Sequence, residues 1–268
     1  MLRNVALKTL RDQRRAFGWW ALGIVLIVVS TVPFYPSIRD QAQALNEYIE
    51  KMPEALRAVF IGQIGDITSP EGFLNSQLFA FLGPLLFSIF AIGSGTRAVA
   101  GEERAGTLDL LLSTPLPRRR LVVHTFVAMT VSTVALALVL WVSLAVAGAI
   151  WSLDIRADRV AAAVANTALL GLVLGSLALA LGAASGRKGT TIGVAAALGF
   201  AAYLVNSLAT VVDAFRSLRK ASPFYYYGEP NPLLHGFDLG SALTLAAISL
   251  ILLALAVFAF ERRDLGVG

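Results

Sequence analysis

The sequence predicts an all-α integral membrane protein that crosses the bilayer six times. The 268 residues are 57% hydrophobic and only 15% charged, and the mean hydropathy is +0.72, whereas a soluble domain carries ~25% charged residues. The apolar residues also fall into six continuous blocks, and ~20 such residues are enough to cross a ~30 Å hydrocarbon core. Since the blocks do not alternate between polar and apolar residues, they favour helices over barrel strands. The six blocks are Trp19–Pro36, Gln77–Thr96, Leu121–Ile150, Val160–Ala184, Gly189–Val212 and Leu239–Phe260.

The distribution of lysine and arginine predicts that both termini are cytoplasmic. If the N-terminus is inside, the inner segments hold 14 Lys and Arg against 6 Asp and Glu, and the outer segments hold 8 against 11. A bias of this kind sets the orientation of membrane proteins. The net charge of +5 is therefore attributed to topology, and no nucleic-acid partner is expected. The inner segments are 1–18, 97–120, 185–188 and 261–268.

Residues 1–18 are expected to form an amphipathic helix in the inner membrane interface, ahead of the first span. At ~100° per residue the apolar and basic side chains separate onto two arcs, and a basic arc suits anionic head groups. The alternative is a simple positive flank of the first span. The apolar arc holds Leu2, Val5, Ala6 and Leu10, and the basic arc holds Lys8, Arg11, Arg14 and Arg15, with Leu7 as an exception. The first span is too long for a signal peptide and lacks a cleavage site, so we expect it to be retained.

Two outer segments carry features of their own. Segment 37–75 shows apolar residues at helical spacing between positions 45 and 60, which predicts an amphipathic outer helix. Segment 213–238 contains the aromatic run 224–227 and three prolines, Pro223, Pro230 and Pro232. The prolines exclude a continuous helix, so a short half-helix or re-entrant turn is expected. The aromatic rings are expected to form part of a membrane-interface belt.

Small residues recur four apart in the fourth and fifth blocks. Such spacing lets helix backbones approach closely in a membrane, so these glycines are expected to pack helices together, with a gate or a dimer seam as the lesser alternative. They are Gly171 and Gly175, Gly182 and Gly186, and Gly189 and Gly193.

The chain lacks the residues that most catalytic or ion-coupled mechanisms need. There is no cysteine, which excludes disulfides and thiolate chemistry, and no HExxH or GxSxG motif. The middle of each predicted span has no charged residue, whereas proton- and ion-coupled transporters place such residues there. Gly186–Thr191 resembles a P-loop only in part, because Lys188 is followed by glycine. We therefore expect no catalytic residue, metal site or cofactor in this chain.

The segment between the second and third blocks is the most distinctive. Residues 101–120 read GEERAGTLDLLLSTPLPRRR. Thr107 could cap a short helix that Pro115 and Pro117 would end. The run Leu108–Leu112 is too apolar to stay solvated without a partner or the bilayer. The segment therefore predicts a cytoplasmic docking element for another protein.

This segment resembles the signature of type-2 ABC exporter permeases, which show the pattern EExxGTLxxLLxxPxxR between their second and third spans. The resemblance implies a single permease domain over 1–268, a coupling helix within 97–120, and a plasma-membrane location in a prokaryote. It also implies that two copies pair and sit on two separate ATPase subunits, which bind ATP and Mg. The matching residues are Glu102, Glu103, Gly106, Thr107, Leu108, Leu111, Leu112, Pro115 and Arg118.

The resulting hypothesis is a non-catalytic permease subunit of an ATP-driven exporter, in contact with the lipid bilayer, a second copy and a separate ATPase. An apolar pathway between the copies would favour amphipathic cargo over ions. Two alternatives remain at this stage. One is a gradient-driven transporter or channel that works without a partner, and the other is a membrane anchor that couples to an ATPase without moving cargo.

Overall fold

The computed structural model of the chain describes residues 5–41, 47, 51–53, 56, 68–97, 117–209 and 212–263. All regular structure within these ranges is helical, and six of the helices are long and apolar enough to cross a membrane. The prediction of an all-α protein with six spans is therefore confirmed. Short helices lie between the last two spans: α12 (Asp213–Arg216), η4 (Arg219–Ala221), α13 (Pro223–Gly228) and α14 (Pro232–His235).

The six spans follow the predicted blocks, with ends that differ by a few residues. The first consists of α1 (Val5–Thr31), η1 (Val32–Phe34) and α2 (Tyr35–Asp40), and the second of α5 (Pro70–Leu74), the π-helical turn η2 (Asn75–Phe79) and α6 (Leu82–Thr96). The other four are α9 (Arg118–Ile150), α10 (Ala157–Ser185), α11 (Lys188–Leu208) and α15 (Leu239–Arg262).

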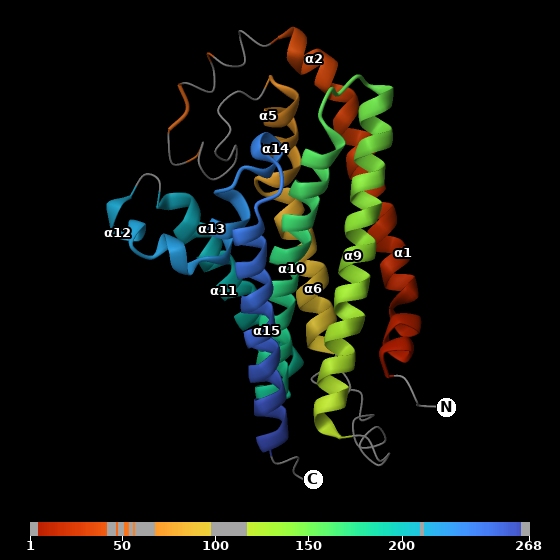
Figure 1. Cartoon of the computed structure of the whole chain (residues 1–268), viewed down its shortest axis with the longest axis vertical. Coiled ribbons are helices and arrows are strands. Elements are labelled where there is room, and N and C mark those ends of the chain that lie inside the picture. The colour runs from red at the N-terminus through yellow and green to blue at the C-terminus, as the bar shows by residue number, and fades with distance from the viewer. Residues whose placement is uncertain are drawn as a thin grey trace.

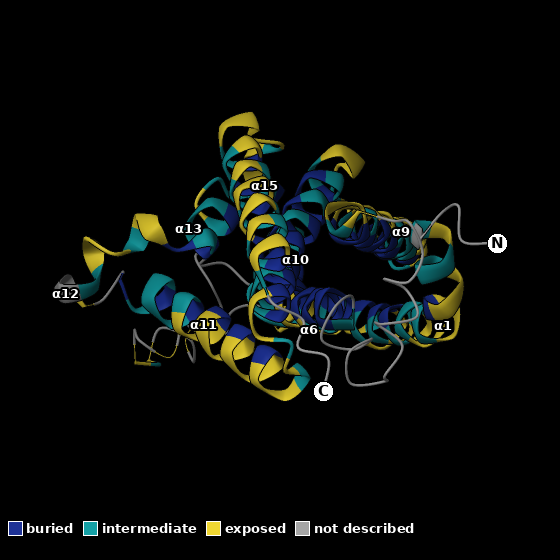
Figure 2. Ribbon diagram, turned by 90° about the horizontal axis from the view of Figure 1, so that it is seen from below, coloured by how far each residue is buried: buried dark blue, intermediate teal, exposed yellow. Residues whose placement is uncertain are grey.

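Helix α10 is the centre of the bundle. It packs against α6, α9, α11 and α15, while α1 packs mainly against α9. Figure 2 shows α10 and α6 in the middle, α1 and α9 on one side and α11 on the other. In the most apolar stretch of α10, 72% of the residues are buried, against 22% in α1 and in α15. Helices α1 and α15 thus present exposed residues to lipid or to another protein chain.

The start of α1 and the end of α15 lie at the same end of the bundle (Figure 1). This end also holds the C-terminus of α6 and the N-terminus of α9, and we refer to it as the terminal end. The opposite end carries α2, α5 and α14 (Figure 1). An even number of spans requires this arrangement, and the expected cytoplasmic placement of both termini is consistent with it.

Local capping explains where two of the helices begin. Ser69 is the N-cap of α5, because its hydroxyl accepts a hydrogen bond from the Gly72 amide and Pro70 occupies the first turn. The second span therefore starts at Pro70 rather than at Gln77 as predicted. Asp238 caps α15 in the same way through the Ser241 amide, at 2.7 Å.

The second span is interrupted near its middle. Pro84 has no amide hydrogen, so the Ala80 carbonyl loses its helical partner. The turn before it is π-helical, and Phe81 adopts a non-helical conformation with φ −139° and ψ −54°. A Cβ on Gly83 would lie 2.8 Å from the Leu78 carbonyl oxygen, so glycine is needed for this close approach. The second span is therefore a broken helix, which the hydropathy pattern did not predict.

The N-terminal region differs from the expected separate interfacial helix. Helix α1 begins at Val5 and continues without a break into the first span. The basic arc is present as a face of this long helix, with Arg11, Arg14 and Arg15 exposed and Gln13 buried on the other side. Its position relative to the bilayer stays a prediction.

Candidate functional site

The candidate site is the terminal end of the bundle, where the predicted docking segment is attached. Helix α6 ends at Thr96, and α9 begins at Arg118 after the exposed Pro117. The segment between them carries eight of the nine residues assigned to ATPase coupling, and all eight lie outside the described residues: Glu102, Glu103, Gly106, Thr107, Leu108, Leu111, Leu112 and Pro115. Their assignment stays a prediction.

Arg118 is the one coupling residue that the structure describes, and it contacts the end of α15. Its Nη1 donates hydrogen bonds to the carbonyl oxygens of Arg263, at 2.7 Å, and of Phe260, at 3.5 Å. Its guanidinium carbon lies 6.0 Å from the centre of the Phe260 ring. The last carbonyls of a helix lack intrahelical donors and carry a partial negative charge. Arg118 therefore closes the C-terminus of α15, a contact that the family pattern did not predict.

An apolar cluster lies beneath this contact and joins three helices. It consists of Leu121 and Val122 from α9, Leu179 and Ala183 from α10, and Ala256 and Phe260 from α15. Phe260 is fully buried, so the ring that Arg118 meets is fixed by the core. The N-terminus of α9 is consequently held to both α10 and α15.

The terminal end is strongly basic. Arg97 closes α6 by donating from Nε to the Gly93 carbonyl at 3.0 Å, and Arg262 stacks on the Phe258 ring at 4.1 Å. Clustered cations of this kind suit the negative surface of an anionic leaflet. The basic residues described at this end are Lys8, Arg11, Arg14, Arg15, Arg97, Arg118, Arg119, Arg120, Arg187, Lys188, Arg262 and Arg263.

The six glycines assigned to helix packing fall into three groups. A Cβ on Gly171 would lie 3.2 Å from the Phe87 Cβ, and one on Gly175 would lie 2.6 Å from the Met129 Sδ and 2.9 Å from the Ala91 Cβ. These two glycines therefore set the approach of α10 to α6 and α9. Gly182 is also buried in α10.

The remaining three glycines do not have the expected role within this chain. Gly186 follows α10 with φ 65°, a left-handed conformation that ends a helix and favours glycine. Gly189 and Gly193 on α11 have no atom within 4 Å of an added Cβ. Their surroundings are open, so they pack against no other helix of this chain in the part that the structure describes.

Gly95 was not predicted, and it makes a closer approach to a neighbouring helix than Gly171 or Gly175. A Cβ there would overlap the Gly175 carbonyl oxygen. Gly93, two residues earlier, has only the end of the Arg97 side chain nearby, at 3.8 Å. Composition does not distinguish these two glycines, because the difference depends on which face of α6 meets α10.

A buried polar node joins the broken second span to α10 and α13. The Tyr227 hydroxyl donates to the Phe79 carbonyl at 2.6 Å and lies 3.4 Å from the Thr167 hydroxyl. Asn166 donates to the Tyr227 carbonyl at 3.4 Å. Tyr227 and Phe224 are buried, so the expectation that the aromatic run forms an interface belt is wrong for these two rings. Tyr227 instead supports the interrupted helix, and the Phe224 ring packs against the Tyr203 ring of α11, with the ring centres 5.4 Å apart.

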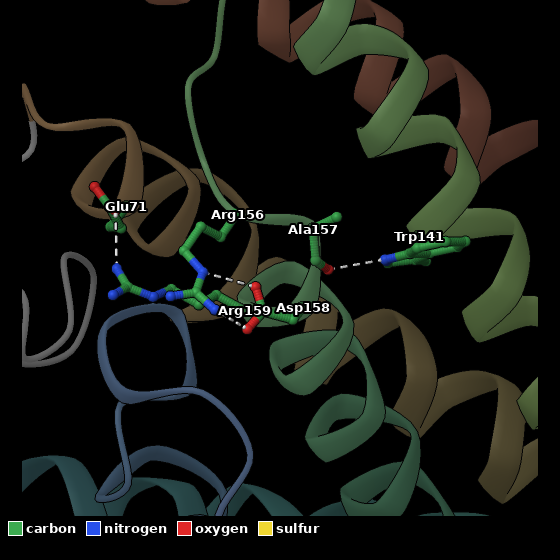
Figure 3. Close-up of polar contacts among 6 residues, drawn as sticks. All are labelled: Glu71, Trp141, Arg156, Ala157, Asp158 and Arg159. Atoms are coloured by element: carbon green, nitrogen blue, oxygen red, sulfur yellow. Dashed lines mark hydrogen bonds and ion pairs between the residues drawn. The ribbon is translucent and has the colours of Figure 1, made fainter.

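Polar contacts also fix the start of α10 at the end opposite the termini (Figure 3). Arg159 on α10 pairs with Glu71 on α5 at 3.6 Å. The Trp141 indole on α9 donates to the Ala157 carbonyl at 3.2 Å. Arg156 and Asp158 pair with each other at 2.8 Å, and both are exposed. The first turn of α10 is thus tied to α5 and α9, its neighbours on two sides.

The chemistry available in the bundle interior is neutral. The buried polar side chains of the described residues are those of Ser, Thr, Asn and Gln and the hydroxyls of buried tyrosines such as Tyr227, and no group of His, Asp or Glu within the described ranges has the arrangement of a metal site. Hydroxyl groups such as those of Thr125 and Ser176 bond the carbonyl four residues earlier. These side chains stabilise helices in an apolar medium and offer no acid–base pair.

Comparison with known proteins supplies the family. No curated protein matches the chain. The model of the ABC-2 family transporter protein family matches residues 3–265. The match covers almost the whole chain and includes the basic terminal end, all six spans and the segment between the second and third spans. The chain therefore belongs to the ABC-2 family of transporter proteins and is a multi-pass membrane subunit of the ABC permease type.

Proposed function

We propose that this chain is the permease subunit of an ATP-driven exporter, that it works as a pair of identical copies, and that segment 97–120 docks on a separate ATPase subunit. The family match over residues 3–265 carries the transporter part of this proposal. The apolar run of leucines in a segment that joins two spans at the basic end supports the docking part.

The neutral interior favours an external energy source. A gradient-driven transporter needs ionisable groups or ion ligands inside the membrane. The described interior offers hydroxyls and amides that are mostly bonded to helix carbonyls. Hydrolysis of ATP, with its Mg, is therefore assigned to the partner ATPase rather than to this chain.

The packing suggests how a movement of the docking segment would reach the membrane helices. On one side the segment continues from α6, whose backbone meets α10 at Gly95 and Gly175. On the other side it leads into α9, which Arg118 ties to the end of α15. A push on the segment would therefore act on α10 from one side and on α15 from the other. Closure of the ATPase would bias the two states of this bundle.

The second copy is proposed to meet this one along the outer helices. Small residues allow close helix approach in lipid, and Gly189 and Gly193 on α11 face open space. Helix α1 also presents an exposed apolar face with Leu22, Leu26 and Val29. A pathway bounded by such surfaces would suit amphipathic cargo.

The basic terminal end is proposed to face the cytoplasm of a prokaryotic cell.

The proposal is tested by co-expressing the tagged chain with the ATPase from the adjacent reading frame and by measuring ATP hydrolysis of the captured complex. Replacing both Leu108 and Leu111 with Asp is expected to remove ATPase binding, because two charges replace the apolar contact, while the chain still inserts into the membrane. The matched control replaces Leu56 and Leu234, which are exposed leucines near the opposite end, with Asp and should retain the complex. A complex that survives the Leu108 and Leu111 changes would refute the docking assignment.

A further inference from the structure

The end of the bundle opposite the termini carries an open cup formed by α13, the turns on both sides of α14 and the start of α15. It encloses about 570 Å³. The side chains that define it here are Tyr225, Tyr226, Glu229, His235, Phe237 and Asp238. The cup is separate from the terminal end, and its composition of three rings, two carboxylates and a histidine is unlike that of the apolar helix surfaces.

The rings of the cup present faces suited to a cation. The centres of Tyr225 and Tyr226 are 5.1 Å apart with an angle of 87° between the planes, and Phe237 is 55% exposed. The face of an aromatic ring is negative and attracts cations, with Arg and quaternary ammonium groups as common examples. The chain provides an example itself, because the Arg219 guanidinium lies 5.1 Å from the centre of the Tyr225 ring.

The charges around the cup leave an excess of negative charge. Arg219 pairs with Glu229, so this carboxylate is balanced. Asp238 is exposed, and hydrogen bonds from Ser241 lower the pKa of its carboxyl, which keeps it ionised at neutral pH. The N-terminus of α15 contributes about half a positive charge, which reduces the excess without cancelling it.

We propose that this cup binds an organic ammonium group, with the onium carbons against the rings and the charge facing Asp238. A trimethylammonium group needs no hydrogen-bond acceptor and is attracted by ring faces. Arg219 already lies over one face of Tyr225, so the group is proposed to rest against Tyr226 and Phe237, beside the unbalanced carboxylate of Asp238. The volume leaves room for part of the attached molecule. This inference does not depend on the exporter proposal, because the cup can be occupied whether or not the chain transports cargo.

The test uses the purified full-length chain and choline as the probe, measured by calorimetric titration. The matched probe is 3,3-dimethylbutan-1-ol, which has nearly the shape of choline without its charge. Choline is expected to bind in the millimolar range, as exposed cation–ring contacts allow, and the neutral isostere at least about tenfold more weakly. Equal binding of the two probes, or no saturable binding of choline, would overturn the proposal.

Two substitutions locate the site. Asp238→Asn keeps the helix cap, because Asn also caps helices, and removes the charge, whereas Phe237→Leu removes a ring. Both side chains are exposed, so the fold should be unaffected. Each change is expected to weaken choline binding about three- to tenfold, while Phe200→Leu, which alters a 57% exposed ring on α11, should leave it unchanged. Unchanged binding in both cup variants would place choline elsewhere and exclude this site.

The ammonium group could belong to a free molecule or to a lipid head group, and nanodiscs distinguish the two. If lipid head groups fill the cup, choline binds more weakly in phosphatidylcholine discs than in phosphatidylglycerol discs. If the cup takes a soluble molecule, choline binds equally well in both.

Discussion

Gly95 and Gly175 bring the backbones of α6 and α10 into direct contact: a Cβ on Gly95 would overlap the carbonyl oxygen of Gly175. A Cβ on Gly175 would lie 2.6 Å from the Met129 sulfur of α9 and 2.9 Å from the Ala91 Cβ of α6. No side chain therefore separates α6 from α10 here, and the Met129 side chain of α9 packs directly against the Gly175 backbone. Close packing of this kind replaces the hydrophobic drive that is absent between helices in lipid.

Gly95→Ala is expected to destabilise the bundle, because the added methyl meets a backbone oxygen that cannot rotate away. Overpacking in a core costs typically ~1–3 kcal/mol, and the overlap with backbone places this change at the upper end. The matched control is Gly93→Ala on the same helix, which meets only the end of the Arg97 side chain and should be neutral or slightly stabilising. The measurement is the thermal unfolding midpoint of the purified chain in detergent. Equal midpoints for the two variants would contradict the direct contact between the backbones of α6 and α10.

The spans could be predicted from sequence because hydropathy is a local property, and ~20 apolar residues have few alternatives to crossing a bilayer. Contacts between spans are not local. The sequence contains Gly93 and Gly95 two positions apart, and only the rotation of α6 determines that Gly95 meets α10. The same holds for Gly189 and Gly193, which have the same spacing as Gly171 and Gly175 but face open space.

The aromatic run shows a second limit of sequence reasoning. Tyr225 and Tyr227 are chemically identical, and the composition of the run predicts an interface belt. In the structure Tyr227 is buried and bonds the Phe79 carbonyl, whereas Tyr225 lines the open cup. This difference depends on the break at Phe81, which frees polar backbone groups that need partners. The break could have been anticipated from Pro84, since proline inside a span removes a backbone hydrogen bond.

Tyr227→Phe is expected to destabilise the chain by ~1–3 kcal/mol, because it leaves a buried carbonyl oxygen with one partner fewer. Burial raises the pKa of the Tyr227 hydroxyl, despite a hydrogen bond from Thr167, so the group remains a donor at neutral pH. Its stabilisation is fully present below the unfolded pKa of about 10 and is lost as the pH rises through the higher folded pKa. Chemical unfolding at neutral pH measures the cost. Tyr226→Phe, next to it and half-buried, is the control and should change stability little; a similar loss in both variants would argue against the bond to Phe79.

Arg118→Gln is expected to loosen the last turn of α15. The guanidinium bonds the Arg263 carbonyl at 2.7 Å and lies beside the buried Phe260 ring, and a hydrogen bond to a charged group contributes ~1.5 kcal/mol or more. Amides of residues 258–263 should therefore exchange with deuterium about tenfold faster.

Arg119→Gln is the matched control for this change, because Arg119 is the next residue along α9 and is exposed. It should leave exchange in α15 unchanged. Arg118→Lys keeps the charge without the planar donor set, so an intermediate rate is expected. If Arg118→Gln leaves the exchange of residues 258–263 unchanged, α15 is held by the apolar cluster of Leu121, Leu179 and Phe260 alone, and Arg118 is free to meet another chain. If exchange rises as expected, Arg118 at the start of α9 holds the end of α15 together with the apolar cluster beneath it.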